Sequence, residues 1–95
     1  MISIIKRIRF SRHAYRRLEI RSMMFNIFMH DAMQRSLETV RCGAISRTKH
    51  SSEGCKVYCR YFSDNLSFYV VCDESYIDGI ADVNIRTVMI CEGRE

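Results

Sequence analysis

Hydrophobic residues are spaced as in a strand at the N-terminus, as in helices from Ser11 to Cys42, and as in strands along the second half of the chain. At the N-terminus, Ile2 to Arg9 is rich in β-branched residues and alternates well enough to predict a first strand. Ser11 to Arg21 then has helical spacing, because Ala14 and Leu18 form an apolar strip. The hydroxyl of Ser11 stands where an N-cap would pair a free backbone N–H of the first turn.

A second helix is predicted within Ser22 to Cys42, where apolar residues continue at helical spacing. The two helices would form a hairpin joined near Met23 to Asn26. Gly43 follows the pattern directly and predicts a left-handed helix stop, with Arg41 in the last turn, where a cation suits the helix dipole. The cluster of Met and Phe residues from Met23 to Met33 is expected in the core, with a partner surface as the alternative.

The second half of the chain predicts an antiparallel meander. Ala44 to Gly54 is polar and is expected to be a strand edge running into an exposed loop. Cys55 to Tyr61 alternates, with Lys56, Tyr58 and Arg60 on one face and the apolar residues on the other. The remaining elements expected are a turn at Ser63 to Asn65, a central strand over Leu66 to Cys72, a looser stretch over Asp73 to Asp82, and a last strand over Asn84 to Cys91.

These elements predict an α+β fold with an N-terminal strand, a helix hairpin and a three-stranded meander. The chain of 95 residues, 47% of them hydrophobic, is long enough for one modest core, so a single domain over residues 1–95 is expected. In the last strand, Ile85, Thr87 and Met89 would face opposite to Arg86, Val88 and Ile90.

Charge and cysteine content narrow the class of protein. The formal charge of +4 favours anionic partners, and a mildly basic protein without such a partner is the alternative. The five cysteines lack paired C-x-x-C spacing, so we expect buried free thiols in a reducing compartment and no metal site. Lys6, Arg7 and Arg9 interrupt the apolar N-terminus, so neither a signal peptide nor a membrane segment is predicted and a cytoplasmic location is expected.

One stripe of the first helix is basic. His13, Arg17 and Arg21 recur every four residues, and each such step advances only about 40° around a helix. The run Ser11, His13, Ala14, Arg17, Leu18 and Arg21 resembles the opening Ser-x-His-Ala-x-x-Arg-[Met/Leu]-x-x-Arg of the domain-of-unknown-function 4258 family. The chain departs from that family at Ser22, where glycine is frequent, and at Met89, where the family often has tyrosine.

The family looks like a branch of the RelE/ParE-like toxin fold, which is grouped with metal-independent ribonucleases. The resemblance therefore implies a β-α-α-β-β-β arrangement with the helices packed on one face of a curved sheet. It also implies RNA as substrate and a cognate antitoxin or another protein as partner, with no cofactor.

Metal-independent RNA cleavage needs a proton acceptor, a proton donor and cations that hold the charge gathering on the phosphate. His13 could exchange a proton near neutral pH, and Tyr58 could stack on a base or donate a proton. Arginine side chains could clamp the phosphate with their planar fork. The candidate catalytic residues are His13, Tyr58, Arg60 and Arg86, and the candidate nucleic-acid-binding residues are Arg17, Arg21, Lys49 and Lys56. His50 is a second acid/base candidate.

Each candidate also has a structural interpretation. His13 could be an interior histidine, with Arg17 and Arg21 bound to backbone carbonyls. Lys56, Arg60 and Arg86 could be a solvated sheet face, Tyr58 could be surface packing, and His50 could be an idle loop residue. Two functions therefore stand: a toxin-like endoribonuclease that cleaves RNA by transesterification, and a non-catalytic module, such as a phage-encoded inhibitor or regulator, that holds nucleic acid or protein.

Overall fold

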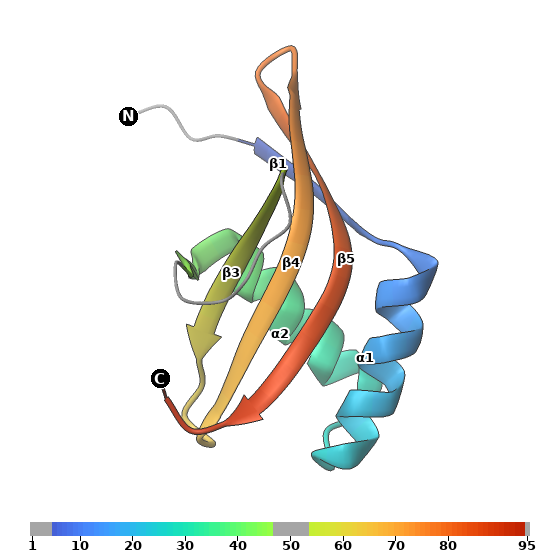
Figure 1. Cartoon of the computed structure of the whole chain (residues 1–95), viewed down its shortest axis with the longest axis vertical. Helices are drawn as coiled ribbons and strands as arrows, with labels where there is room; N and C mark the ends of the chain where they lie inside the picture. Colours follow the sequence, from blue (N-terminus) through green and yellow to red (C-terminus); the bar gives the residue numbers. More distant parts are fainter. Residues whose placement is uncertain (1–4, 47–53, 95) are drawn as a thin grey trace.

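The protein is an α+β domain in which two helices pack against a five-stranded mixed sheet (Figure 1). A computed structural model describes residues 5–46 and 54–94. The elements are β1 (Ile5–Phe10), α1 (Arg12–Met24), α2 (Met29–Cys42), β2 (Ala44–Ile45), β3 (Cys55–Tyr61), β4 (Leu66–Ile77) and β5 (Ile80–Glu92). Lys49 and His50 lie outside the described residues, as do the first residues of the predicted N-terminal strand.

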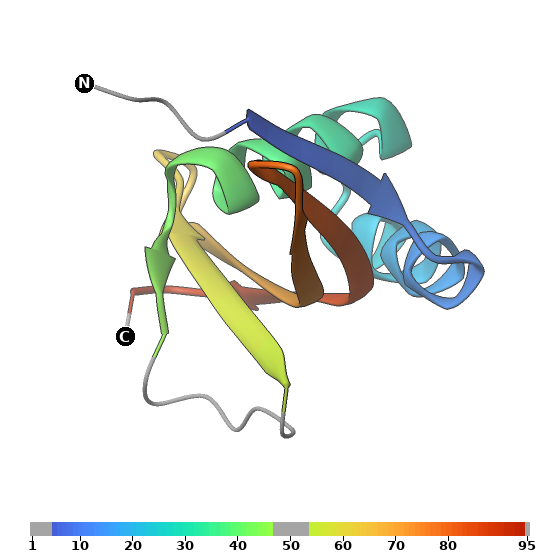
Figure 2. The same cartoon turned by 90° about the horizontal axis from the view of Figure 1, so that it is seen from above.

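The strands lie in the order β1-β5-β4-β3-β2. β1 pairs parallel to the first half of β5, with Ile5 opposite Ile80 and Phe10 opposite Ile85. All other neighbours are antiparallel, and the sheet curves strongly (Figure 2). The predicted meander is therefore confirmed, with a short extra strand at one edge and the N-terminal strand at the other.

The core lies between the sheet and the helices. Tyr58, Val70 and Val88 are register partners across β3, β4 and β5, so they share one face of the sheet. All three belong to the buried cluster that contains Leu18 of α1 and Val40 of α2. We call this the helix-covered face, and the opposite one the outer face.

The hairpin between β4 and β5 differs from the predicted loose stretch. β4 continues to Ile77 and β5 begins at Ile80, so only Asp78 and Gly79 connect them. Both residues have positive φ, 52° and 78°, as the two central residues of a type I′ turn require. The prediction over Asp73 to Asp82 was wrong because Asp-Gly is a tight hairpin signal between two strands.

A β-bulge displaces the second half of β5. Val71 is opposite Thr87 and the next residue, Cys72, is opposite Ile85, so Arg86 has no partner on β4. Ile85 and Val88 both point into the core, while Thr87 is the partner of Val71 on the outer face. The predicted strict alternation, with Ile85, Thr87 and Met89 on one face, was therefore wrong.

The end of α2 also differs from prediction. Gly43 has φ −77° and ψ 167°, an extended conformation and not a left-handed one. A Cβ atom at this position would lie 2.4 Å from the carbonyl oxygen of Thr39 and 2.6 Å from that of Cys59. Glycine is thus explained by the close approach of the helix end to β3.

The cysteines are free, as predicted, but only Cys72 is buried. Cys42 is exposed and the others are half-buried, so the prediction of buried thiols was wrong for most of them. Burial, together with the charge of Glu74, raises the pKa of Cys72 to about 12, which keeps this thiol protonated.

Candidate functional site on the outer face

The start of α1 is fixed against the bulge in β5. The hydroxyl of Ser11 accepts a hydrogen bond from the N–H of Ala14 at 3.0 Å, which confirms the predicted N-cap. The backbone N–H of Ser11 donates to the carbonyl of Ile85 at 3.0 Å, and its hydroxyl lies 3.5 Å from the carbonyl of Arg86. The first turn of α1, with His13, therefore has a set position relative to Arg86.

The end of α1 is fixed to the same strand by Arg21. β1 pairs with β5 only as far as Ile85, so beyond that residue α1 lies along β5 in place of a strand. The guanidinium of Arg21 donates to the hydroxyl of Thr87 at 3.3 Å and to the carbonyl of Val88. Arg21 thus donates a hydrogen bond to a backbone carbonyl at the edge of β5, beyond the point where β1 ends.

These contacts create a hollow of about 240 Å³ lined by His13, Cys55, Val71, Arg86 and Thr87. His13 is exposed, so its interpretation as an interior histidine was wrong. Arg17, on the same helix stripe, is exposed as well. Among residues 5–46 and 54–94 it has no backbone partner, whereas Arg21 binds the carbonyl of Val88. The hollow therefore combines an accessible imidazole with a guanidinium.

The guanidinium of Arg86 interacts with two residues of the sheet, one on β3 and one on β4. Its guanidinium donates to Sγ of Cys55 at 3.5 Å, and its Nε lies 3.6 Å from a carboxylate oxygen of Asp73. The thiol of Cys55 in turn donates to Asp73 at 3.2 Å. The hydrogen bond to Cys55 and the charge of Asp73 raise the pKa of Arg86, so this cation stays charged.

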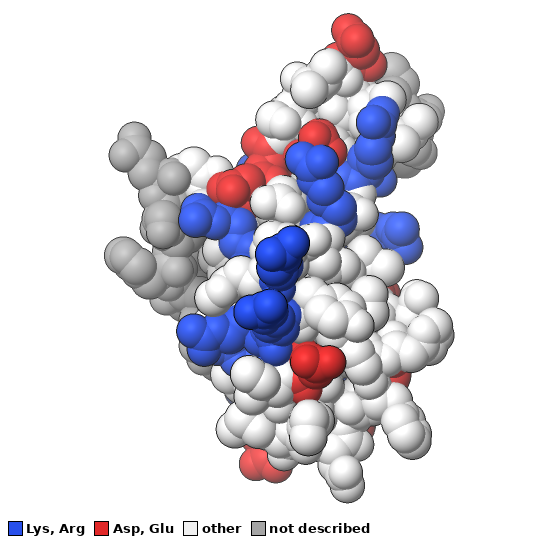
Figure 3. Space-filling view, turned by 90° about the vertical axis from the view of Figure 1, so that its right-hand side faces the viewer, with Lys and Arg blue, Asp and Glu red and all other residues white. Residues whose placement is uncertain are grey.

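Exposed arginines continue from the hollow over α1. Arg12, Arg16 and Arg17 are all exposed, as are Arg7 and Arg9 of β1. Figure 3 shows lysine and arginine side chains gathered over the middle of this side of the molecule. Within the part of the chain that the structure describes, Arg12, Arg16 and Arg17 form no ion pair.

Tyr58, Arg60 and Lys56 lie on the helix-covered face, apart from the hollow. Tyr58 is 5% exposed and its hydroxyl donates to Glu74 at 2.8 Å, so it cannot stack on a base. Burial, with the bond to Glu74, raises the pKa of Tyr58 and keeps it protonated. Arg60 pairs with Glu38 of α2 at 3.4 Å, and Lys56 binds Glu74.

The alternation of β3 was predicted correctly, but its polar face was wrongly assigned to solvent or to a nucleic-acid groove. Arg60 instead reaches Glu38 of α2, and Lys56 binds Glu74 of β4. Of the four candidate catalytic residues, the structure brings together His13 and Arg86. Sequence reasoning missed Cys55, Asp73 and Thr87, because their place depends on strand register and on the bulge, for which the sequence holds no signal.

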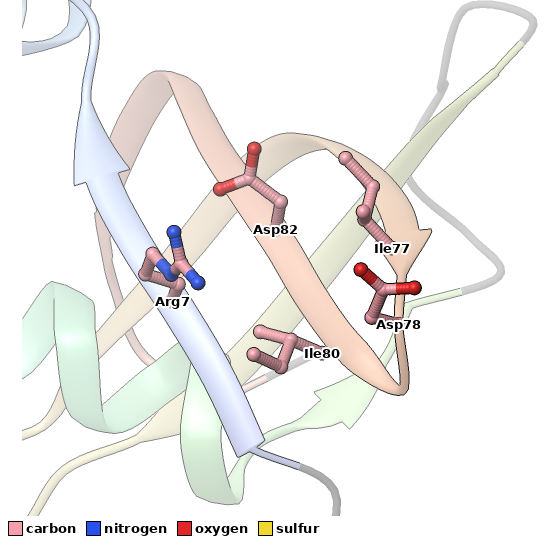
Figure 4. Close-up of a pocket in the computed structure, with 5 residues that line it drawn as sticks. All are labelled: Arg7, Ile77, Asp78, Ile80 and Asp82. Atoms are coloured by element: carbon pink, nitrogen blue, oxygen red, sulfur yellow. The ribbon is translucent and has the colours of Figure 1, made fainter.

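A second hollow, of about 120 Å³, lies at the β4–β5 hairpin (Figure 4). It is lined by Arg7, Ile77, Asp78, Ile80 and Asp82, and Arg7 is the register partner of Asp82. The carboxylate of Asp82 also lies 3.6 Å from the guanidinium of Arg9. Two carboxylates beside an arginine make this hollow a poorer anion site than the one at His13.

Residues 5–46 and 54–94 contain neither a metal-binding cluster nor a membrane-spanning helix. No group of three or more His, Cys, Asp or Glu side chains there could hold a metal ion. Neither helix is long and apolar enough to cross a membrane.

Comparisons with known proteins returned no match, whether against protein-family models, curated proteins or solved structures.

Proposed function

We propose that this protein binds RNA across α1 and the outer face of β5 and cleaves it without a metal ion, as a toxin-like endoribonuclease of RelE-like fold. One observation carries the proposal: His13 and Arg86, from different elements, line the same hollow. Arg17 on the stripe of His13 extends the positive surface, and a guanidinium presents a planar fork to phosphate oxygens.

The chemistry would be an internal transesterification. The 2′-oxygen attacks the adjacent phosphorus and loses its proton, and the bond from phosphorus to the 5′-oxygen breaks as that oxygen gains a proton. Asp73 is the proton acceptor in this scheme and His13 the donor, since imidazole suits proton transfer near neutral pH. Arg86 holds the negative charge that gathers on the phosphate. The products are a 2′,3′-cyclic phosphate and a free 5′-hydroxyl.

The test is incubation of the purified protein with a structured RNA in EDTA, followed by mapping of the fragment ends. We expect cyclic phosphate ends from the wild type. His13→Ala and Arg86→Ala should each slow cleavage by roughly a hundredfold or more. Arg60→Ala is the matched control, because it removes one arginine from the helix-covered face and should leave the rate within about twofold.

A non-catalytic RNA-binding module is the second candidate. The observation that favours it is the placement of Tyr58 and Arg60 away from the hollow, which leaves His13 as its single imidazole among the described residues. The binding module would be favoured if a range of RNA substrates stayed intact but bound the wild type, and bound the Arg86→Ala variant more weakly. RNA that neither binds nor is cleaved would refute both.

A further inference from the structure

Four large apolar side chains are exposed where α1 meets α2, so the prediction of a core position was wrong for Met23, Met24 and Phe28. Their exposed fractions are 57% for Ile20, 77% for Met23, 73% for Met24 and 87% for Phe28. We call these four residues the junction patch. Exposed apolar residues that occur singly need no explanation, but a contiguous group marks an interaction surface. In Figure 3 the lower end of the molecule, where this junction lies, shows no lysine or arginine.

The backbone of the junction is held in one shape. The N–H of Phe25 donates to the carbonyl of Arg21 at 3.2 Å, and that of Ile27 to the carbonyl of Ser22 at 2.8 Å. The side chains of Phe25, Ile27 and Met29 pack against the core. The junction patch therefore projects from a fixed base, which lowers the entropy that binding would cost.

The junction patch surrounds a hollow. Met23, Asn26, Ile27 and Phe28 line a space of about 280 Å³. Binding energy at protein interfaces concentrates where an aromatic or aliphatic anchor fills such a pocket. A lipid surface would cover exposed apolar side chains but has no anchor to place in a hollow between them. This feature favours a protein as the occupant.

Charge next to the junction patch identifies the chemistry of that protein. Arg12, Arg16, Ile20 and Met23 follow each other at intervals of four, four and three residues, so they form one stripe of α1. The stripe points away from the core, because Ala14 and Leu18, on the opposite side of the helix, are fully buried. It is basic toward the start of α1 and apolar toward the junction patch, with one exposed carboxylate, Glu19, between the two parts.

A second copy of this chain does not complement the stripe. In a two-fold pair of antiparallel α1 helices, Arg12 and Arg16 of one copy would lie against the apolar end of the other, where no carboxylate of the stripe meets them, and both copies carry a formal charge of +4. A helix with carboxylates on one part of its face and apolar residues on the next matches both parts of the stripe.

We infer that the outward stripe of α1 and the junction patch form a docking surface for an acidic amphipathic helix of a protein partner. An apolar side chain of that helix would enter the hollow between Met23 and Phe28, and its carboxylates would meet Arg12 and Arg16. This surface does not include the hollow at His13, but it shares Arg12 and Arg16 with the proposed RNA-binding surface. The inference goes beyond the proposed function.

The test uses a display library of helical peptides with the whole protein as bait. We expect the enriched peptides to be acidic, with aromatic or aliphatic residues at i and i+4. Met23→Ser combined with Phe28→Ser should weaken the enriched peptides at least tenfold, and serine at position 28 suits the N-cap of α2. Ile77→Ser is the matched control, because Ile77 is 61% exposed at the far hairpin, and it should leave affinity within twofold.

A charge reversal on the same helix gives an independent readout. Arg12→Glu combined with Arg16→Glu should shift the enriched peptides from acidic to basic. Enrichment of neutral or basic peptides by the wild type, or no enrichment, would overturn the inference. Binding to anionic phosphatidylserine vesicles that depends on Met23 and Phe28 would assign the surface to lipid, and self-association in sedimentation would assign it to a second copy. RNA cleavage should be unchanged in the Met23 and Phe28 variant, so failure here is distinct from failure of the proposed function.

Discussion

At the scale of single residues, Glu74 is a nearly buried carboxylate on the helix-covered face with three hydrogen-bond partners. Its side chain is 2% exposed and binds the ammonium of Lys56. The hydroxyls of Tyr58 and Tyr76 donate to its two oxygens at 2.8 and 3.0 Å. Burial alone would raise the pKa of this carboxyl, but the hydrogen bonds from Lys56, Tyr58 and Tyr76 outweigh it and lower the pKa.

The consequence is a pH-dependent contribution to stability. A carboxyl with a lowered pKa in the folded state stabilises the fold above its unfolded pKa, and this contribution is lost as pH falls through the folded pKa. Glu74→Gln should therefore lower the free energy of unfolding by about 2 kcal/mol at pH 7. The difference from wild type should shrink as the pH is lowered below the unfolded pKa, as measured by urea unfolding at a series of pH values.

Glu38→Gln is the control for that series. Glu38 also pairs with an arginine, Arg60, but its side chain is 48% exposed. Exposed ion pairs contribute little, so this variant should lose no more than about 0.5 kcal/mol at pH 7. Equal losses in the two variants, or a loss in Glu74→Gln that is the same at every pH, would contradict the role given to Glu74.

At the scale of elements, the connection between α2 and the sheet depends on Gly43. A Cβ atom there would meet two backbone oxygens, and neither can move like the end of a flexible side chain. Gly43→Ala should therefore cost about 2 kcal/mol, or roughly 10 °C in melting temperature for a domain of this size.

Gly79→Ala separates close approach from backbone strain. Gly79 has φ 78° in the tight hairpin, and nothing lies near its Cβ position. This variant should cost about 1 kcal/mol from strain alone. A Gly43→Ala protein that melts at or above the temperature of Gly79→Ala would show that the helix end has room to shift.

Much of the element order could be predicted from the sequence, because local periodicity and capping residues determine it. The N-cap at Ser11, the strand Cys55–Tyr61 and the turn at Ser63 to Asn65 all follow from local signals. The bulge at Arg86 does not, since it depends on how β5 pairs with β4.

The candidate site also combines features that the local sequence determines with features that depend on tertiary packing. Helical spacing places His13 and Arg17 on one exposed stripe. Which side of β3 faces α2 depends on tertiary packing and not on the local sequence. Tyr58 and Arg60 were therefore wrongly predicted to lie on an exposed face of the sheet. The meeting of His13 with Arg86 combines both kinds of information, because it needs the helix stripe and the bulge together.

At the scale of the whole molecule, the position of the positive charge matters more than its total. The formal charge is only +4, but Arg12, Arg16, Arg17 and Arg86 are exposed on α1 and on the neighbouring half of β5. An RNA strand lying on this surface would neutralise several phosphates at once and release their counterions. For single strands the logarithm of affinity falls with the logarithm of salt concentration by about 0.7 for each phosphate neutralised.

If the four arginines each meet one phosphate, that slope should be about −3 for the wild type. Arg17→Ala combined with Arg86→Ala should reduce its magnitude by about 1.4, because two of the phosphate contacts are removed. Arg60→Ala combined with Arg41→Ala lowers the net charge equally, with Arg60 held by Glu38 and Arg41 in the last turn of α2. This control should keep the slope near −3 if local charge governs binding. An equal reduction in the two double variants would mean that RNA responds to the net charge of the molecule, and the surface on α1 and β5 would lose its special role.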